Sequence, residues 1–149
     1  MTRLFTYGSN MAGVEMEAVA PGARFLGPAR LDRHRLELRR RSVRWGGGAV
    51  DIVQAEGECV WGALYEVDDF DALDAKEGTA LAAYCRRSVT VELRGERVTA
   101  DAYEVIEKEH EEVPPTREYA ELLLAGAQER DLPAAYVKEL GRRLAKNTW

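Results

Sequence analysis

Apolar and polar residues alternate along most of the first two thirds of the chain, which predicts a series of short strands. The candidate strands cover residues 3–7, 23–31, 34–39, 49–53, 59–67, 86–94 and 97–106. The last two flank Arg94-Gly95-Glu96 and predict a hairpin. Pro28 predicts an edge strand or a bulge in its run, and the apolar residues on both faces of 59–67 predict a central strand. Gly46-Gly47-Gly48 predicts a flexible loop.

A helical period replaces the alternation elsewhere in the chain. Residues 11–19 predict one or two helical turns, and Asp68-Asp69 predicts the start of a short helix with Glu77 near its end and Gly78 as its C-cap. Two longer helices are expected over 116–129 and from Asp131 to Lys146. Strands come first and helices finish the chain, with no repeat or linker. We therefore expect an α+β fold, a small mixed β-barrel with flanking helices, in one domain over residues 1–149.

Composition narrows the classes of function. The 149 residues are 46% hydrophobic and 32% charged with a net charge of −5, which argues against a nucleic-acid partner. Cys59 and Cys85 have no metal-like spacing and there are two histidines, so we expect reduced thiols and no metal site. Neither a signal peptide nor a run of about 20 apolar residues is visible, so no membrane partner and a cytoplasmic location are expected.

One basic stretch runs against the overall charge. It consists of Arg30, Arg33, Arg35, Arg39, Arg40, Arg41 and Arg44. A solvated strand face is the favoured interpretation, because the acidic run from Glu107 to Glu112 offsets the charge, and a nucleic-acid binder is the weakest hypothesis. The glycines at 46–48 lack the Lys-Ser/Thr of a phosphate-binding loop.

The turn Tyr7-Gly8-Ser9-Asn10 is the first candidate for chemistry. A glycine directly after a strand allows a sharp turn that leaves N–H groups unpaired, and such groups bind carboxylates or a developing oxyanion. Ser9 and Asn10 add side-chain donors. An ordinary polar turn is the alternative interpretation.

Glu77 is the second candidate. A carboxylate at the C-terminal end of a helix is disfavoured by the macrodipole, and desolvation would raise its pKa further, which suits a general acid/base. Asp74, three residues earlier, fits a hydrogen-bonding support. A solvated glutamate at a helix end remains the alternative. Tyr84 and Tyr119 either reach into a pocket or bury their rings.

Taken in order and spacing, these segments resemble the γ-glutamylcyclotransferase-like (AIG2-like) family over nearly the whole chain. The matching residues are Leu4-Phe5-Thr6-Tyr7-Gly8-Ser9-Asn10-Met11, Phe25-Leu26-Gly27, Gly48-Ala49-Val50-Asp51-Ile52, Val60-Trp61-Gly62-Ala63-Leu64-Tyr65, Leu73-Asp74, Glu77-Gly78, Tyr84, Tyr119, Gly126-Ala127, Leu132-Pro133 and Tyr136-Val137. Serine and asparagine after Tyr7-Gly8 resemble the general branch, not the glutathione-specific branch.

The resemblance implies a small β-barrel with flanking helices and an enzyme that converts a γ-glutamyl amide or γ-glutamylamine into 5-oxoproline and a free amine, without a cofactor. By position it implies Glu77 as general acid/base. The substrate-binding residues it implies are Tyr7, Gly8, Ser9, Asn10, Tyr84 and Tyr119.

The sequence departs from the family pattern at Glu15, where members commonly have arginine, and near Val19, which is also not basic. If those arginines hold a substrate carboxylate or orient the loop, substrate choice differs here. A non-catalytic binding module that retains the pocket is therefore the alternative hypothesis.

Overall fold

A closed five-stranded barrel forms the centre of the computed structural model, which describes residues 2–77 and 83–146. The elements in chain order are β1 (Thr2–Thr6), the 3₁₀ turn η1 (Ser9–Met11), α1 (Gly13–Val19), β2 (Arg24–Ser42), β3 (Gly47–Val67), α2 (Asp71–Glu77), β4 (Tyr84–Leu93), β5 (Glu96–Val105), α3 (Arg117–Glu129) and α4 (Ala134–Lys146). The strand order is β1-β3-β2-β4-β5, and a parallel contact between β1 and β5 closes the ring. This confirms the expected mixed barrel with flanking helices.

The strands differ from the expectation in length. The predicted strands 23–31 and 34–39 together form the long strand β2, and the predicted strands 49–53 and 59–67 together form the long strand β3. Bulges let the pairing between β2 and β3 continue past the interruptions in the pattern. One bulge lies between Phe25 and Gly27, as the proline after it predicted. The loop expected at 46–48 is wrong for Gly47 and Gly48, which begin β3. At Gly48 a Cβ would lie 1.8 Å from the Val113 carbonyl oxygen, so glycine is required for close packing and not for a loop.

The turn chemistry of the other elements follows the sequence. Arg94 and Gly95 have φ of 50° and 84°, as a two-residue type I′ turn requires, and they join β4 to β5. The Thr116 side chain accepts a hydrogen bond from the Tyr119 N–H and caps α3. The helix expected from Asp68-Asp69 begins at Asp71, and Asp69 accepts a hydrogen bond from its N–H at 2.9 Å. Gly78, the expected C-cap of this helix, lies outside the described residues.

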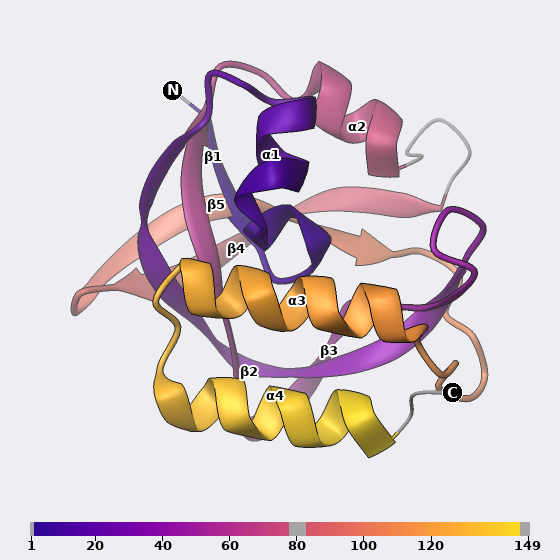
Figure 1. The fold of residues 1–149 in the computed structure, drawn as a ribbon. Helices are drawn as coiled ribbons and strands as arrows, with labels where there is room; N and C mark the ends of the chain where they lie inside the picture. The colour runs from indigo at the N-terminus through magenta and orange to yellow at the C-terminus, as the bar shows by residue number, and fades with distance from the viewer. Residues whose placement is uncertain (1, 78–82, 147–149) are drawn as a thin grey trace.

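The helices lie on the outside of the barrel (Figure 1). α3 and α4 run antiparallel and side by side along one side, whereas α1 and α2 lie close together near one end. The buried core combines residues of the strands with the inner faces of α3 and α4, including Leu123, Leu140 and Leu144. Each helix within residues 2–77 and 83–146 is too short or too polar to span a lipid bilayer.

Candidate active site

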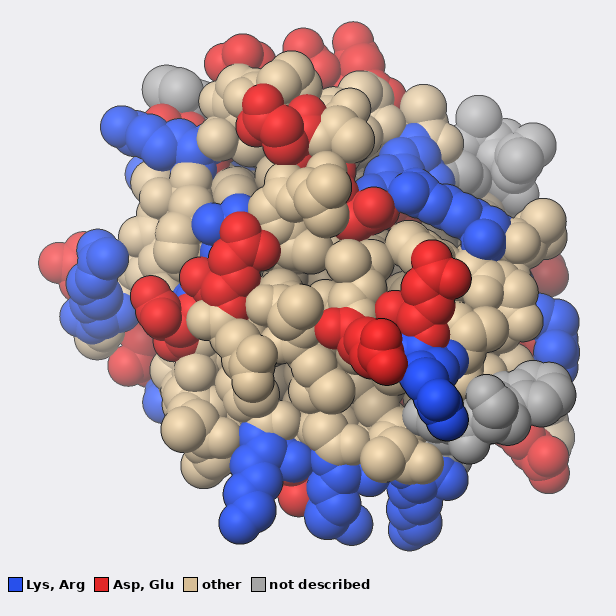
Figure 2. Space-filling model, in the orientation of Figure 1, with Lys and Arg blue, Asp and Glu red and all other residues tan. Residues whose placement is uncertain are grey.

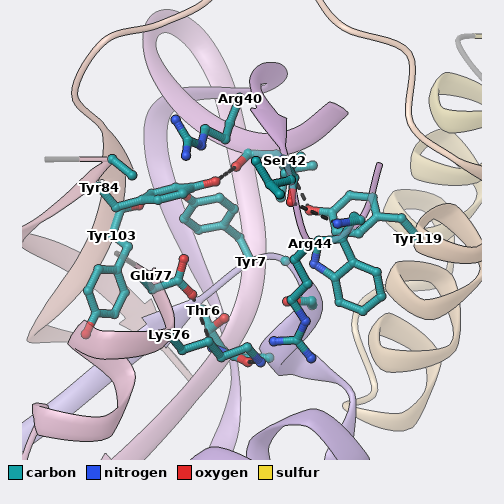
Figure 3. A pocket seen from close by; sticks show the side chains of 18 of the residues that line it. Thr6, Tyr7, Arg40, Ser42, Arg44, Lys76, Glu77, Tyr84, Tyr103 and Tyr119 are labelled. Carbon is teal, nitrogen blue, oxygen red and sulfur yellow. Dashed lines mark hydrogen bonds between the residues drawn. The ribbon is translucent and has the colours of Figure 1, made fainter. Parts of the chain in front are cut away.

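A cavity of about 460 Å³ opens between the loop after β1, the end of α2 and the hairpin end of β2 and β3 (Figure 3). All seven residues predicted from the sequence to form the site line this cavity: Tyr7, Gly8, Ser9, Asn10, Glu77, Tyr84 and Tyr119. Segments as distant as residues 7 and 119 thus share one space. This arrangement makes the cavity the candidate active site.

Glu77 lies in this cavity at the last turn of α2, where its side chain is half-buried. Desolvation raises the pKa of Glu77 to about 7, and the positive charges of Lys76 and Arg44 oppose that rise. The Oε1 atom lies 3.4 Å from the Nδ2 atom of Asn10, which is buried. A carboxylate with a pKa near neutrality can both accept and return a proton at physiological pH.

The loop after β1 forms the other side of the site. The Tyr7 hydroxyl donates a hydrogen bond to the Tyr103 carbonyl and anchors the loop to β5. At Gly8 an added Cβ would lie 2.9 Å from Val50 Cγ2 and 3.7 Å from the Tyr119 hydroxyl oxygen. The absence of a side chain at Gly8 therefore keeps the cavity open at this position.

Tyr84 and Tyr119 both reach the backbone of Val50 on β3. The Tyr119 hydroxyl accepts a hydrogen bond from the Val50 N–H at 3.0 Å, and the Tyr84 hydroxyl donates one to the Val50 carbonyl at 3.3 Å. Burial raises the pKa of both phenols well above their ordinary value, so both stay protonated. The Tyr119 oxygen therefore still carries a hydrogen that it can donate into the cavity.

A side-chain cluster fixes α2 on the hairpin of β4 and β5. Asp74 accepts hydrogen bonds from the Tyr103 hydroxyl at 2.6 Å and from Arg86 Nε at 2.8 Å. The Arg86 guanidinium also lies 4.4 Å from the centre of the Phe70 ring. Since Glu77 lies one turn beyond Asp74 on the same helix, this cluster sets the position of the candidate acid/base. The supporting role expected for Asp74 agrees with these bonds.

Tyr103→Phe tests this anchoring. A hydrogen bond to a charged acceptor contributes about 1.5–3 kcal/mol, so we expect the free energy of unfolding to fall by about 1–2 kcal/mol because Asp74 keeps Arg86. We also expect kcat to fall several-fold with little change in KM, because Glu77 loses its fixed position. Urea unfolding and steady-state kinetics on the same preparation measure both. Unchanged stability and kcat would contradict the anchoring role.

Glu15 occupies a defined place beside the cavity. Its Oε1 atom lies 2.9 Å from Arg44 and 3.1 Å from Lys76 Nζ, and Lys76 also donates a hydrogen bond to the Asn10 side-chain oxygen. The carboxylate of Glu15 thus links the β2–β3 hairpin to α1 and α2. Glu15 departs from the family pattern, but Arg44 and Lys76 compensate its negative charge.

Sequence reasoning missed several residues of this cavity. Arg40, Arg44, Trp45, Lys76 and Tyr103 all line it. Arg40 and Arg44 belong to the basic stretch that we interpreted as a solvated strand face. The cluster of arginines was visible in the sequence, but its position beside the cavity was not. A bulge in β2 and the turn of a hairpin place these two in the cavity, and neither follows from the alternation of residues.

Most of the basic stretch is paired with carboxylates. Arg30 pairs with Asp32 and Glu92, and Arg39 pairs with Glu37. On the face seen in Figure 2, basic side chains gather along the edge below α4, whereas acidic and basic side chains mix over the rest. The paired arginines favour the interpretation as a strand face over a nucleic-acid site.

Known proteins are similar to this chain in sequence and in fold. A model of the AIG2-like family matches residues 59–140. The bovine (Bos taurus) protein named γ-glutamylcyclotransferase is 32% identical over 143 residues, which span 91% of this chain and 75% of the bovine protein. A solved structure named γ-glutamyl cyclotransferase superposes with a TM-score of 0.89 at 29% identity and covers 93% of this chain and 85% of its own.

Another solved structure resembles this chain in fold at a much lower sequence identity. It is described as a γ-glutamylcyclotransferase specific to glutathione from yeast, and it is 12% identical with a TM-score of 0.68, covering 99% of this chain and 96% of its own. At that identity the likeness concerns the fold alone. The match to the family model and the 32% identity to the bovine protein are stronger, and they show that this chain belongs to the AIG2-like, γ-glutamylcyclotransferase-like family.

Proposed function

We propose that this protein is a cyclotransferase that releases 5-oxoproline and a free amine from a γ-glutamyl amide or γ-glutamylamine. Glu77 acts as general acid/base, and Tyr7, Gly8, Ser9, Asn10, Tyr84 and Tyr119 surround the γ-glutamyl group. The observation that carries the proposal is that a carboxylate with a pKa of about 7 faces the glycine turn across one cavity. The names of relatives such as the bovine protein support it.

The chemistry requires the attacking nitrogen to lose two protons and the leaving nitrogen to gain them. The α-amine of the substrate is an ammonium at neutral pH, so it must lose a proton before its nitrogen can attack the γ-carbonyl carbon. Glu77 takes that proton, a C–N bond forms, and a tetrahedral intermediate with an oxyanion results. Glu77 then returns the proton to the leaving nitrogen as the original C–N bond breaks and the carbonyl re-forms. The ring nitrogen gives up its second hydrogen as a proton, which the released amine takes up to become an ammonium. Nucleophile and electrophile belong to one molecule, so the enzyme contributes mainly the folded pose and the proton transfers.

Donors in the loop suit the oxyanion. The first N–H groups of a 3₁₀ turn have no partner within the turn, and η1 begins at Ser9 directly beside the cavity. The Tyr119 hydroxyl is a further donor on the Gly8 side. Loss of one such donor typically costs about 2.7–4 kcal/mol of barrier.

The decisive assay incubates the wild-type protein with γ-glutamyl-amino acids, γ-glutamylamines and glutathione. We expect 5-oxoproline and the free amine in equal amounts from at least one compound, and the weakest turnover with glutathione. An α-glutamyl dipeptide is the control, because its γ-carboxylate carries no amine to release. Thermal stabilisation by these compounds without product from any of them would contradict the proposal and support the binding module instead.

Location remains a prediction. Cys59 and Cys85 are free and exposed, as suits a reducing compartment such as the cytoplasm. No cofactor enters the proposed reaction, because neither bond that changes requires oxidation or reduction.

The organisation of residues 1–149 as one domain is also part of the proposal.

A further inference from the structure

Arg40 is a positively charged residue of the cavity that has no acidic partner among the residues the structure describes. It lies on β2, half-buried, and its guanidinium extends toward the cavity near Tyr84 (Figure 3). In the described part of the chain, Arg39 and Arg44 each form an ion pair with a glutamate, whereas no carboxylate lies within 4.0 Å of Arg40. A guanidinium withdrawn from water without a partner is unfavourable, and an anionic ligand would remove that cost.

The backbone explains why Arg40 faces the cavity. Glu37 pairs with Asp51 and Arg40 pairs with Ala49, so three steps along β2 correspond to two along β3. This bulge adds one residue to β2 and changes which side chains face inward. Arg41, the next residue, is exposed on the outside.

The other positive charges of the cavity are already paired. Lys76 binds Asn10 and Glu15, and Arg44 binds the same Glu15. Arg40 therefore provides the uncommitted positive charge among the described residues that line the cavity. An arginine also presents a planar pair of N–H donors that fits the two oxygens of a carboxylate.

We propose that Arg40 is a specificity-determining residue that binds a carboxylate of the substrate through two N–H···O hydrogen bonds. The proposal rests on the proposed function, because a γ-glutamyl compound is what brings a carboxylate into the cavity. The carboxylate has two possible sources: the α-carboxylate of the γ-glutamyl group, or the carboxylate of an amino acid that serves as the leaving amine. The chemistry recognised at Arg40 is the same in both cases.

The test compares Arg40→Gln, Arg40→Lys and the wild type on γ-glutamyl-alanine and γ-glutamylethylamine, which differ by the carboxylate of the leaving amine. We expect Arg40→Gln to raise KM about tenfold to a hundredfold, as loss of a charge-assisted pair does. Arg40→Lys keeps the charge without the fork and should lie between the two. If Arg40→Gln raises KM for both substrates, Arg40 binds the α-carboxylate of the γ-glutamyl group. If it raises KM for γ-glutamyl-alanine alone, Arg40 binds the carboxylate of the leaving amine.

Arg41→Gln is the matched control, because it removes the same charge from the neighbouring exposed position. A KM for Arg40→Gln within twofold of the wild type on both substrates would overturn the inference while leaving the proposed function intact. Calorimetry of γ-glutamyl-alanine on the Glu77→Gln background separates the two failures. About tenfold weaker binding after Arg40→Gln is added supports the carboxylate site even without turnover, and unchanged or absent binding overturns it.

Discussion

Glu77→Gln is expected to lower kcat for 5-oxoproline release by about 10²–10⁴-fold, with a much smaller change in KM. Glutamine keeps the size of the side chain and can still accept the contact with Asn10, but it cannot take a proton from the substrate amine. The loss therefore concerns the proton transfers and not the shape of the cavity. Steady-state kinetics with chromatographic detection of 5-oxoproline measure the effect.

Asp71→Asn is the matched control. Asp71 lies on the same short helix but is exposed to solvent, so we expect its amide variant to retain wild-type turnover. Equal turnover by the wild type and Glu77→Gln would show that another group moves the proton. In that case the position of Glu77 in the cavity would have no catalytic meaning.

The raised pKa of Glu77 gives this prediction a pH dependence. Glu77 must be ionised to act as a base, so kcat/KM is expected to fall about tenfold for each pH unit below about 7. Stability changes in the same range. The folded pKa of about 7 exceeds the ordinary value of 4.5, so the contribution of Glu77 to stability is highest below pH 4.5, falls as pH rises to about 7 and is constant above.

Glu77→Gln removes that slope. We therefore expect the variant to be as stable as the wild type near pH 4 and more stable at pH 8, by at most about 3 kcal/mol. Urea unfolding at the two pH values measures the difference. A variant that gains stability at pH 8 while it loses turnover would fit a carboxylate kept in the cavity for chemistry, whereas equal stability at both pH values would contradict the raised pKa.

Gly126→Ala is expected to destabilise the protein by about 1–3 kcal/mol, although alanine is ordinarily the better residue inside a helix. Gly126 lies on the buried side of α3, and an added Cβ would lie 2.7 Å from the Ala12 N atom and 3.0 Å from the Met11 carbonyl carbon. These are backbone atoms, so relief requires moving α3 or the chain that follows the site loop. We expect activity to fall with stability, because Met11 follows directly on Asn10.

Gly141→Ala provides the control with the opposite sign. It makes the same change inside α4, where the nearest atom to the added Cβ is Leu124 Cδ2 at 3.5 Å, an ordinary contact. We expect this variant to gain about 0.5–1 kcal/mol of stability and to keep its activity. Urea unfolding of both variants measures the contrast. If Gly126→Ala were as stable as Gly141→Ala, the result would contradict the inference that α3 packs closely against the chain that follows the site loop.

Local patterns in the chain were sufficient for most of the elements. The hairpin at Arg94-Gly95-Glu96 could be predicted because a glycine turn between two alternating runs is a local signal, and the helix over 116–129 because its apolar residues follow a local period. The extent of β2 and β3 could not be predicted, since their continuity depends on bulges between strands and not on either strand alone. The same reason explains the wrong prediction at Gly47 and Gly48.

The pattern of apolar and polar residues predicts the mixed barrel with flanking helices, and the family resemblance carried by the order of the segments predicts the residues of the candidate site. Three features become visible only in the folded chain: Glu77 is desolvated opposite Gly8, Glu15 is compensated by Lys76 and Arg44, and Arg40 faces the cavity. Secondary structure follows from interactions between residues a few positions apart, which the sequence displays directly. Burial, charge pairing and pKa depend on residues brought together from distant positions in the chain, so they exist only once the barrel has closed.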